Sequence, residues 1–299
     1  MVESWYPGHM AKARRLVKES LAIVDVVIEV RDARLPESSA NPDLRRLTGN
    51  KPMILVLNKE DLAESAITHA WLDYFHQQGI VAIACDAVKG RGINELLQLI
   101  RDAGAPMLER LKGKGRMPRS LRIMIVGIPN VGKSQLINAL TGRNIVRTGD
   151  RAGVTRGQQW IKVGKDVDLL DTPGILWPNE KDPEVLMRLE AISALDGRAG
   201  DPELVALSII SVLHARNDTR IHAYFGIADD SIWGVELLEG IGRLRGLLVS
   251  GGRVDLNKTG VHLMRVFQTG KLNRISMESP QIENNDDGES LDVGGGLHD

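Results

Sequence analysis

The segment GIPNVGKS, residues 127–134, is the feature that most limits which folds this chain can adopt. It fits the pattern G-x-x-x-x-G-K-[ST], in which the backbone N–H groups of a glycine-rich turn surround phosphate oxygens. The apolar run LRIMIVG leads into it, and a helical pattern, VGKSQLINALTG, follows it and stops at Gly142. A strand, a phosphate loop and a helix in this order predict an α/β fold with a site for nucleotide phosphates.

Strand and helix patterns alternate over the first 182 residues. Apolar runs predict strands at residues 23–30, 52–58, 79–84, 121–127, 158–163 and 167–171. Stretches with helical patterns lie between several of them, for example residues 64–78. Such alternation is typical of a parallel sheet covered by helices on both faces. We therefore expect residues 1–182 to form one α/β domain.

The character of the sequence changes after this domain. Residues 183–275 show only helical patterns, which predict a smaller α-helical domain. Residues 276–299 hold seven acidic residues and neither Lys nor Arg, and their Gly-, Asn- and Asp-rich composition predicts a disordered tail. Without that tail, 38 basic residues face 32 acidic ones, a balance that suits a polyanionic partner or an ordinary solvated surface.

The composition indicates a cytoplasmic protein with no membrane partner. Hydrophobic residues make up 42% and charged residues 26%, as in soluble globular proteins. The single cysteine, Cys85, excludes an internal disulfide and fits a reducing compartment. The first residues lack an apolar core of signal-peptide length, and no apolar segment is long enough to span a bilayer.

Further residues match the parts of a Mg²⁺-dependent nucleotide site. In the phosphate loop, Lys133 offers a charge to the β- and γ-phosphates and Ser134 offers a hydroxyl to Mg²⁺. Asp171, in DTPG, follows a predicted strand and could hold Mg²⁺ through water, while the N–H of Gly174 could meet the γ-phosphate. Thr155, in RAGVTRG, is the candidate switch threonine that closes on Mg²⁺. Taken singly, the DTPG and RAGVTRG matches are also compatible with an ordinary turn or loop.

The segment VLNKED, residues 56–61, selects the base. The carboxylate of Asp61 can accept hydrogen bonds from guanine N1–H and the exocyclic amine, whereas adenine offers no matching pair of donors. Asn58 can bond the edge of the base, and the stem of Lys59 can lie along its face. A polar turn with Asp61 as a helix cap would explain this segment alone, but not four matched motifs in one chain. The sequence therefore predicts GTP rather than ATP.

The base loop is predicted at CDAVKG, residues 85–90, after the third strand. Asp86 and Ala87 stand there where a Ser-Ala pair would commonly present its backbone to guanine O6. The guanine motifs thus precede the phosphate loop, although most GTPases begin with that loop. This order is a cyclic permutation of the usual one, and residues 113–120, GKGRMPRS, would join the old chain ends. We therefore predict a circularly permuted GTPase domain.

Six blocks of the sequence, WYPGHMAKA, DARLP, LNKED, GIPNVGKS, GVTRG and DTPGIL, resemble those of the ribosome biogenesis GTPase A family. The resemblance covers nearly the whole chain up to Ile275. It implies a Mg²⁺-dependent GTP hydrolase that acts as a switch in late assembly of the large (50S) ribosomal subunit. It also implies that the helical domain binds ribosomal RNA of pre-ribosomal particles through bases that include Arg216, Arg220, Arg243, Arg245, Arg253, Lys258, Arg265, Lys271 and Arg274.

The same resemblance points to His9 as the catalytic histidine. Many GTPases orient the attacking water with a glutamine after D-x-x-G, but Ile175 occupies that position here. From its position alone, His9 would rather support the first helix. Asn130 could be a ligand for K⁺, although a turn-forming role fits it equally well. The remaining residues expected to bind GTP are neighbours in the phosphate loop: Val131, Gly132 and Gln135.

Two other functions stay open at this point. The chain could be a GTPase that assists transfer RNA modification or another RNA-linked process. It could also be a stand-alone enzyme that uses GTP on a small substrate. The first would require a dedicated modification domain and the second another catalytic constellation, and we find neither in the sequence.

Overall fold

The computed structural model describes residues 7–117, 119–145, 159–171, 182–195 and 200–280, and only the backbone of residues 7–14, 159 and 171. A six-stranded sheet in the order β3-β2-β1-β4-β6-β5 forms its centre. All neighbouring strands are parallel except β5, which pairs antiparallel with β6. The strands are β1 (Val26–Asp32), β2 (Met53–Asn58), β3 (Val81–Cys85), β4 (Leu121–Val126), β5 (Gln159–Val163) and β6 (Val167–Asp171). The prediction of an α/β fold is confirmed, and each of the six predicted strands forms.

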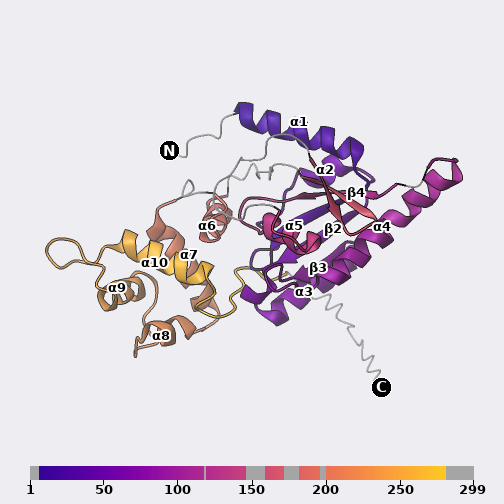
Figure 1. Ribbon diagram of the computed structural model, residues 1–299. Helices are drawn as coiled ribbons and strands as arrows, with labels where there is room; N and C mark the ends of the chain where they lie inside the picture. Colours follow the sequence, from indigo (N-terminus) through magenta and orange to yellow (C-terminus); the bar gives the residue numbers. More distant parts are fainter. Residues whose placement is uncertain (1–6, 118, 146–158, 172–181, 196–199, 281–299) are drawn as a thin grey trace, which may run out of the picture.

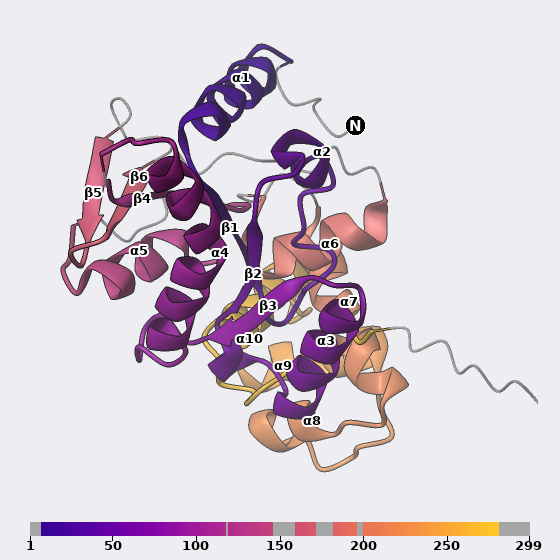
Figure 2. The same ribbon diagram turned by 90° about the vertical axis from the view of Figure 1, so that its right-hand side faces the viewer.

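Helices cover both faces of the sheet because the central strands are apolar on both sides (Figures 1 and 2). Ile28 and Ile123 point to one face, where they share a core with α4 (Ile93–Gly113) and α5 (Lys133–Thr141). Their direct neighbours on the same strands, Val27 and Met124, point to the other face. That second face is covered by α1 (Pro7–Ile23), α2 (Leu44–Thr48) and α3 (Ser65–Gln77).

The sheet has a topological switch point between β1 and β4. From β1 the chain moves outward through β2 to the edge strand β3, and α4 then carries it back to the opposite side of β1. In the parallel register, Asp32 lies beside Asn58, and Asn58 lies beside Cys85. The carboxyl ends of the five parallel strands therefore lie at one edge, where ligands bind in open α/β sheets.

The second part of the chain is helical, and three of its helices begin at aspartate caps. The carboxylates of Asp182, Asp201 and Asp255 accept backbone N–H groups in the first turns of α6, α7 and α10. Proline occupies the first position of α6 and α7, where no hydrogen bond is lost. The helices are α6 (Pro183–Ala191), α7 (Pro202–Ala215), α8 (Arg220–Phe225), α9 (Gly234–Leu244) and α10 (Leu256–Gln268).

After α10 the chain returns to the α/β domain. The N–H groups of Ile275 and Met277 donate to backbone carbonyls of that domain at 3.0 and 2.9 Å. The buried carboxylate of Glu278 accepts the N–H of Ser38 at 3.1 Å. The boundary predicted at residue 276 is therefore too early, since residues 276–278 are buried in the folded body. Average composition over the last 24 residues concealed this short packed segment.

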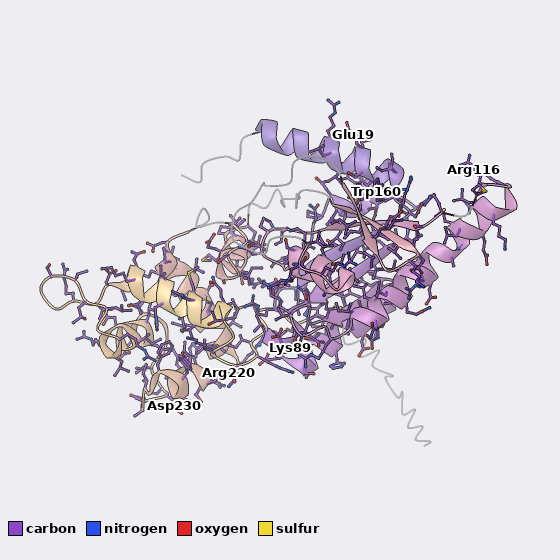
Figure 3. All side chains as sticks on the ribbon, viewed as in Figure 1. Glu19, Lys89, Arg116, Trp160, Arg220 and Asp230 are labelled. Atoms are coloured by element: carbon purple, nitrogen blue, oxygen red, sulfur yellow. The ribbon has the colours of Figure 1, made fainter. Side chains whose placement is uncertain are left out.

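Arginines of the helical domain also reach across the junction. Arg216 and Arg220 pair with Glu64, near the start of α3, at 3.0 and 2.9 Å. Figure 3 labels Arg220 on the helical part, whereas Arg116 lies at the far end of α4. Ion pairs with this partial exposure add little stability, so the apolar core that both parts of the chain share holds them together. Among the described helices, none is both long and apolar enough to cross a bilayer.

Candidate nucleotide-binding site

A pocket of about 400 Å³ opens at the carboxyl edge of the sheet. Both parts of the chain line it. The α/β domain contributes Arg34, Lys59, Asp61, Leu62, Val88, Asn130, Gly132, Lys133, Ser134 and Gln135, and the helical domain contributes Ile192, Ser193 and Gln268. The structure thus brings together two motifs that lie some 70 residues apart in the sequence, and it adds residues from a third segment.

The phosphate loop connects the end of β4 to the start of α5. Gly132 has a φ of 94°, and a Cβ atom there would collide with the side-chain amide of Asn58. Gly127 is similarly constrained, because a Cβ atom would collide with the carbonyl of Val30. Lys133 and Ser134 open α5, whose N-terminus adds a partial positive charge to the pocket. Gly142, at φ 65°, ends this helix as predicted.

Lys133 faces the pocket without a counter-ion among the described residues. Its Nζ donates to the carbonyl of Ile128 at 2.5 Å. Burial, and then the charge of Lys59, lower the pKa of Lys133 to about 7. A bound phosphate would supply the missing negative charge and raise this pKa again.

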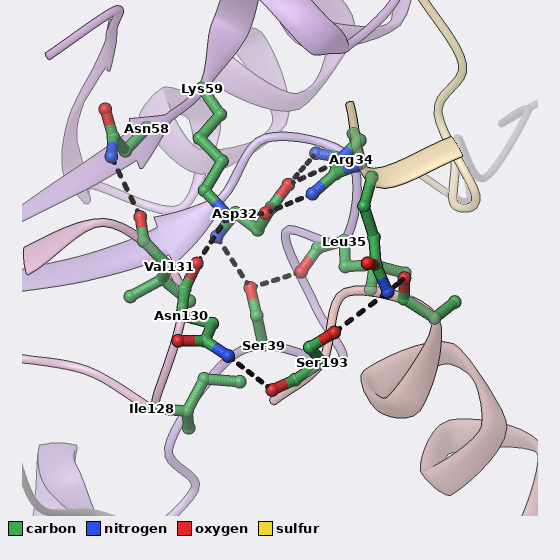
Figure 4. Close-up of polar contacts among 12 residues, drawn as sticks. Asp32, Arg34, Leu35, Ser39, Asn58, Lys59, Ile128, Asn130, Val131 and Ser193 are labelled. Atoms are coloured by element: carbon green, nitrogen blue, oxygen red, sulfur yellow. Dashed lines mark hydrogen bonds and ion pairs between the residues drawn. The ribbon is translucent and has the colours of Figure 1, made fainter. Parts of the chain in front are cut away.

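Lys59 stands in a different environment. Its Nζ lies 3.0 Å from Oδ2 of Asp32 and donates to the carbonyl of Asn130 (Figure 4). Arg34 donates to both carboxylate oxygens of Asp32, from Nε at 2.9 Å and from Nη2 at 2.8 Å. Burial opposes ionisation of Asp32, but Arg34 and then Lys59 outweigh it and hold the pKa of this carboxyl well below its usual range.

Asn58 braces three motifs against one another. Its Nδ2 donates to the carbonyl of Val131 at 2.8 Å, and its Oδ1 accepts the N–H of Ala87 at 3.2 Å. The amide therefore ties the guanine motif to both the phosphate loop and the base loop. Asn58 is buried and does not line the pocket, and its expected contact with the base edge stays a prediction.

In the base loop, the carboxylate of Asp86 turns inward. One oxygen accepts the N–H groups of Val88 and Lys89 at 3.1 and 3.0 Å, and the other pairs with Arg91 at 3.0 Å. Asp86 thus shapes the loop, and Val88 lines the pocket instead of Asp86 or Ala87. Asp61 does line the pocket, as expected, with Nζ of Lys89 at 3.8 Å.

Asn130 connects the phosphate loop to the helical domain. Its Nδ2 donates to the carbonyl of Ser193 at 2.6 Å (Figure 4). Ser193 follows α6, and its hydroxyl accepts Nε2 of Gln268 at 2.8 Å. The neighbouring Val131 is fully buried, so its side chain belongs to the core, and its carbonyl accepts the amide of Asn58.

Several expected site residues lie outside the described side chains. Thr155 and Gly174 fall outside the described residues, and for His9 and Asp171 the structure gives only backbone positions, in the first turn of α1 and at the end of β6. Conversely, sequence reasoning gave no role to Asp32 and Arg34, although it singled out the DARLP block that contains them. Ser193 and Gln268 carry no motif that could have marked them.

Comparisons with known proteins found similar sequences and structures that cover most of the chain. A sequence model described as "50S ribosome-binding GTPase" matches residues 122–221. Proteins named Ribosome biogenesis GTPase A from Bacillus pumilus and Bacillus licheniformis are 42% and 43% identical over 94% of this chain, and the matches cover 100% and 99% of those proteins. GNP-bound YlqF from T. maritima shares 30% identity with a TM-score of 0.62, over 90% of this chain and 99% of that one. A GDP-bound YlqF structure aligns with the same TM-score.

Proposed function

Because the chain belongs to the ribosome biogenesis GTPase A family, we propose that it acts as a GTP-driven switch in late assembly of the large (50S) ribosomal subunit. The chain is a circularly permuted GTPase, and its reaction is the hydrolysis of GTP to GDP and phosphate. One observation carries the switch proposal: the guanine and phosphate motifs meet at a pocket that the helical domain also lines. A change of nucleotide can therefore act directly on that domain.

Guanine recognition is assigned to Asp61, with Lys59 and the base loop around it. The Asp61 carboxylate would accept guanine N1–H and the exocyclic amine, and adenine would leave this carboxylate unpaired. The N–H of Ala87 donates to Oδ1 of Asn58, so it would reach guanine O6 by sharing its hydrogen between the two acceptors or by leaving Asn58. Asp86 keeps the loop in shape through its two accepted N–H groups.

Phosphate binding is assigned to the backbone of the phosphate loop and to Lys133. Mg²⁺ fits the residues present, because the hydroxyl of Ser134 lines the pocket beside Lys133. Ser134, Thr155 and Asp171 would hold the ion, which when bound offsets charge on the β- and γ-phosphates. Among the described residues, no cluster of three or more His, Cys, Asp or Glu side chains offers a separate metal site.

Hydrolysis needs a group that orients water, and we assign this role to His9. Ile175 cannot orient or deprotonate water, whereas an imidazole can do both near neutral pH. Thr155 and Gly174 would contact Mg²⁺ and the γ-phosphate in the GTP state and would lose these contacts after hydrolysis.

K⁺ is the proposed second ion, held by the amide oxygen of Asn130. The carbonyl of Ser193 can only accept, so Nδ2 must face it and Oδ1 is the atom available to a cation. An ion there would offset charge that develops between the β- and γ-phosphates. Faster hydrolysis in KCl than in NaCl of equal ionic strength is expected, and equal rates would reject this role.

The helical domain is the proposed contact with ribosomal RNA. Arg216 and Arg220 are engaged with Glu64, so they are weaker candidates than the family resemblance implied. The other basic residues named for this domain are exposed: Arg243, Arg245, Arg253, Lys258, Arg265, Lys271 and Arg274. Of these, Arg243 and Lys258 also pair with acidic residues, Glu239 at 3.8 Å and Asp255 at 3.1 Å. Contacts from such residues to phosphates would weaken as salt rises.

Sedimentation tests the proposed function. The purified protein is mixed with large-subunit particles and run on sucrose gradients with GDP, with a non-hydrolysable GTP analogue, and without nucleotide. We expect co-migration with the analogue and release with GDP. Absence from the particles in every nucleotide state, with GTP binding intact, would reject the ribosomal role and return attention to other RNA targets such as transfer RNA.

A further inference from the structure

Two lines of polar contacts join the last turn of α10 to the nucleotide pocket. They start at adjacent residues. The carbonyl of Phe267 accepts Nη1 of Arg34 at 3.4 Å, and the Arg34 guanidinium lies over the Phe267 ring, 4.8 Å from its centroid. Gln268 donates through Nε2 to the Ser193 hydroxyl at 2.8 Å and to the carbonyl of Ala191 at 2.9 Å. A single helix end thus holds two different segments of the site.

The first line runs through buried charges to Lys59. Arg34 donates two hydrogen bonds to the carboxylate of Asp32, and this carboxylate pairs with Lys59 at 3.0 Å. The side chains of Arg34 and Asp32 are 2% and 0% exposed, and that of Lys59 is 19% exposed. The carboxylate of Asp32 lies between the positive charges of Arg34 and Lys59, so the position of Arg34 restrains that of Lys59. The Lys59 ammonium in turn donates to the carbonyl of Asn130.

The second line reaches Asn130 from the other side. Ser193 accepts the Asn130 amide on its carbonyl and the Gln268 amide on its hydroxyl. Asn130 and Ser193 have φ values of 61° and 58°, a left-handed conformation that non-glycine residues keep only where surrounding contacts hold it. The two lines therefore close a ring that passes through α10, the guanine motif and the phosphate loop.

We propose that Arg34 and Gln268 are positioning residues of the nucleotide site, and that they couple the seating of the helical domain to the affinity for guanine nucleotide. This inference rests on the proposed roles of Lys59 and Asn130 in binding GTP. Arg34 fixes Lys59 through Asp32, and Gln268 fixes Asn130 through Ser193. Since linkage is reciprocal, a polyanion that moves α10 changes nucleotide affinity by the same factor by which nucleotide changes affinity for the polyanion.

Substitution of Gln268 tests the inference. Gln268→Ala removes both donated hydrogen bonds, and Gln268→Glu keeps the length but cannot donate to the carbonyl of Ala191. Thr269→Ala is the matched control, because that exposed threonine bonds only to Arg265 and Val266 carbonyls of its own helix. Dissociation constants for fluorescent GDP and a GTP analogue are measured by titration. We expect both Gln268 variants to bind roughly 5-fold more weakly or worse, and Thr269→Ala to match the wild type.

The result that overturns the inference is wild-type affinity in both Gln268 variants. A lowered melting temperature of the nucleotide-free variants with unchanged affinity would also overturn it, because a purely structural role predicts that pattern. Lys59→Ala separates this failure from failure of the proposed site. If Lys59→Ala loses nucleotide while Gln268→Ala and Gln268→Glu do not, only the positioning role is wrong; if Lys59→Ala binds normally, the site assignment itself is wrong.

A second variant probes the other line of the ring. Arg34→Lys keeps a positive charge for Asp32 but lacks the planar fork that reaches both Asp32 and the Phe267 carbonyl. We expect it to weaken nucleotide binding less than Lys59→Ala and to leave the protein folded. Wild-type affinity in a folded Arg34→Lys protein would remove Arg34 from the proposal.

Discussion

Lys59 on the guanine side of the pocket and Lys133 on the phosphate side differ in what surrounds their ammonium groups. Lys59 meets the carboxylate of Asp32 at 3.0 Å, inside a network that Arg34 completes. Lys133 meets only a backbone carbonyl among the described residues, and its pKa falls to about 7. The lysine on the guanine side therefore has a carboxylate partner before nucleotide binds, although burial still lowers its pKa, whereas the lysine on the phosphate side would gain its negative partner from the ligand.

Removing the counter-ion of the guanine side should produce the largest effect. Asp32→Asn leaves the buried Arg34 and the half-buried Lys59 without their shared partner, and loss of one member of a buried ionic network costs about 3–5 kcal/mol. We expect the free energy of unfolding to fall by that amount, measured by urea denaturation. Glu19→Gln, which removes the exposed pair with Arg15, should leave it nearly unchanged. Similar curves for both variants would contradict the role given to Asp32.

Substitution of Lys133, on the phosphate side, should weaken nucleotide binding without lowering the stability of the nucleotide-free protein. Lys133→Met is expected to weaken GDP and GTP binding roughly 100-fold, about 3 kcal/mol, because a charged contact to the phosphates is lost. The free energy of unfolding without nucleotide should not fall, since the variant removes a poorly compensated buried charge. Calorimetric titration and urea denaturation check the two halves. If Lys133→Met lowered the free energy of unfolding of the nucleotide-free protein as much as Asp32→Asn does, the proposed difference between Lys59 and Lys133 would be wrong.

The pH dependence of GDP binding should report the lowered pKa of Lys133 in the free protein. The pKa of Lys133 is about 7 in the free protein and should be higher beside phosphates, so between these two values binding takes up a proton. GDP affinity should then fall as pH rises above 7, by up to roughly tenfold per pH unit. Calorimetry at pH 8 in buffers of different ionisation enthalpy measures the proton uptake directly. Lys133→Met should abolish it, and buffer-independent heats in the wild type would refute the expectation.

The base loop offers the smallest expected effect. In Asp86→Ser, a hydroxyl can still accept one of the two N–H groups that the carboxylate holds. We expect GDP binding to weaken by no more than about 1 kcal/mol, and by about 1–3 kcal/mol in Asp86→Val, where both N–H groups lose their partner. Fluorescence titration of the two variants gives the comparison. Equal losses would mean that Asp86 acts on the nucleotide by some other route than loop shape.

Much of the α/β domain could be predicted because its signals are local. Apolar runs of strand length marked all six strands, and the strand–loop–helix context of Lys133 marked the phosphate loop. The bracing role of Asn58 and the inward turn of Asp86 could not be predicted, because a motif names residue types and not the direction of their side chains. The early tail boundary at residue 276 arose from the same limit, since three packed residues do not alter the composition of a long segment.

Local patterns in the sequence were enough to predict a GTP site and the cyclic order of its motifs, because phosphate, guanine and Mg²⁺ each require particular groups at fixed local spacing. The folded structure was needed to see that Asp32 and Arg34 hold Lys59, and that Ser193 and Gln268 of the helical part hold Asn130. Those contacts join residues up to 75 positions apart. Their geometry depends on how two domains pack, and no local pattern in the chain encodes that packing.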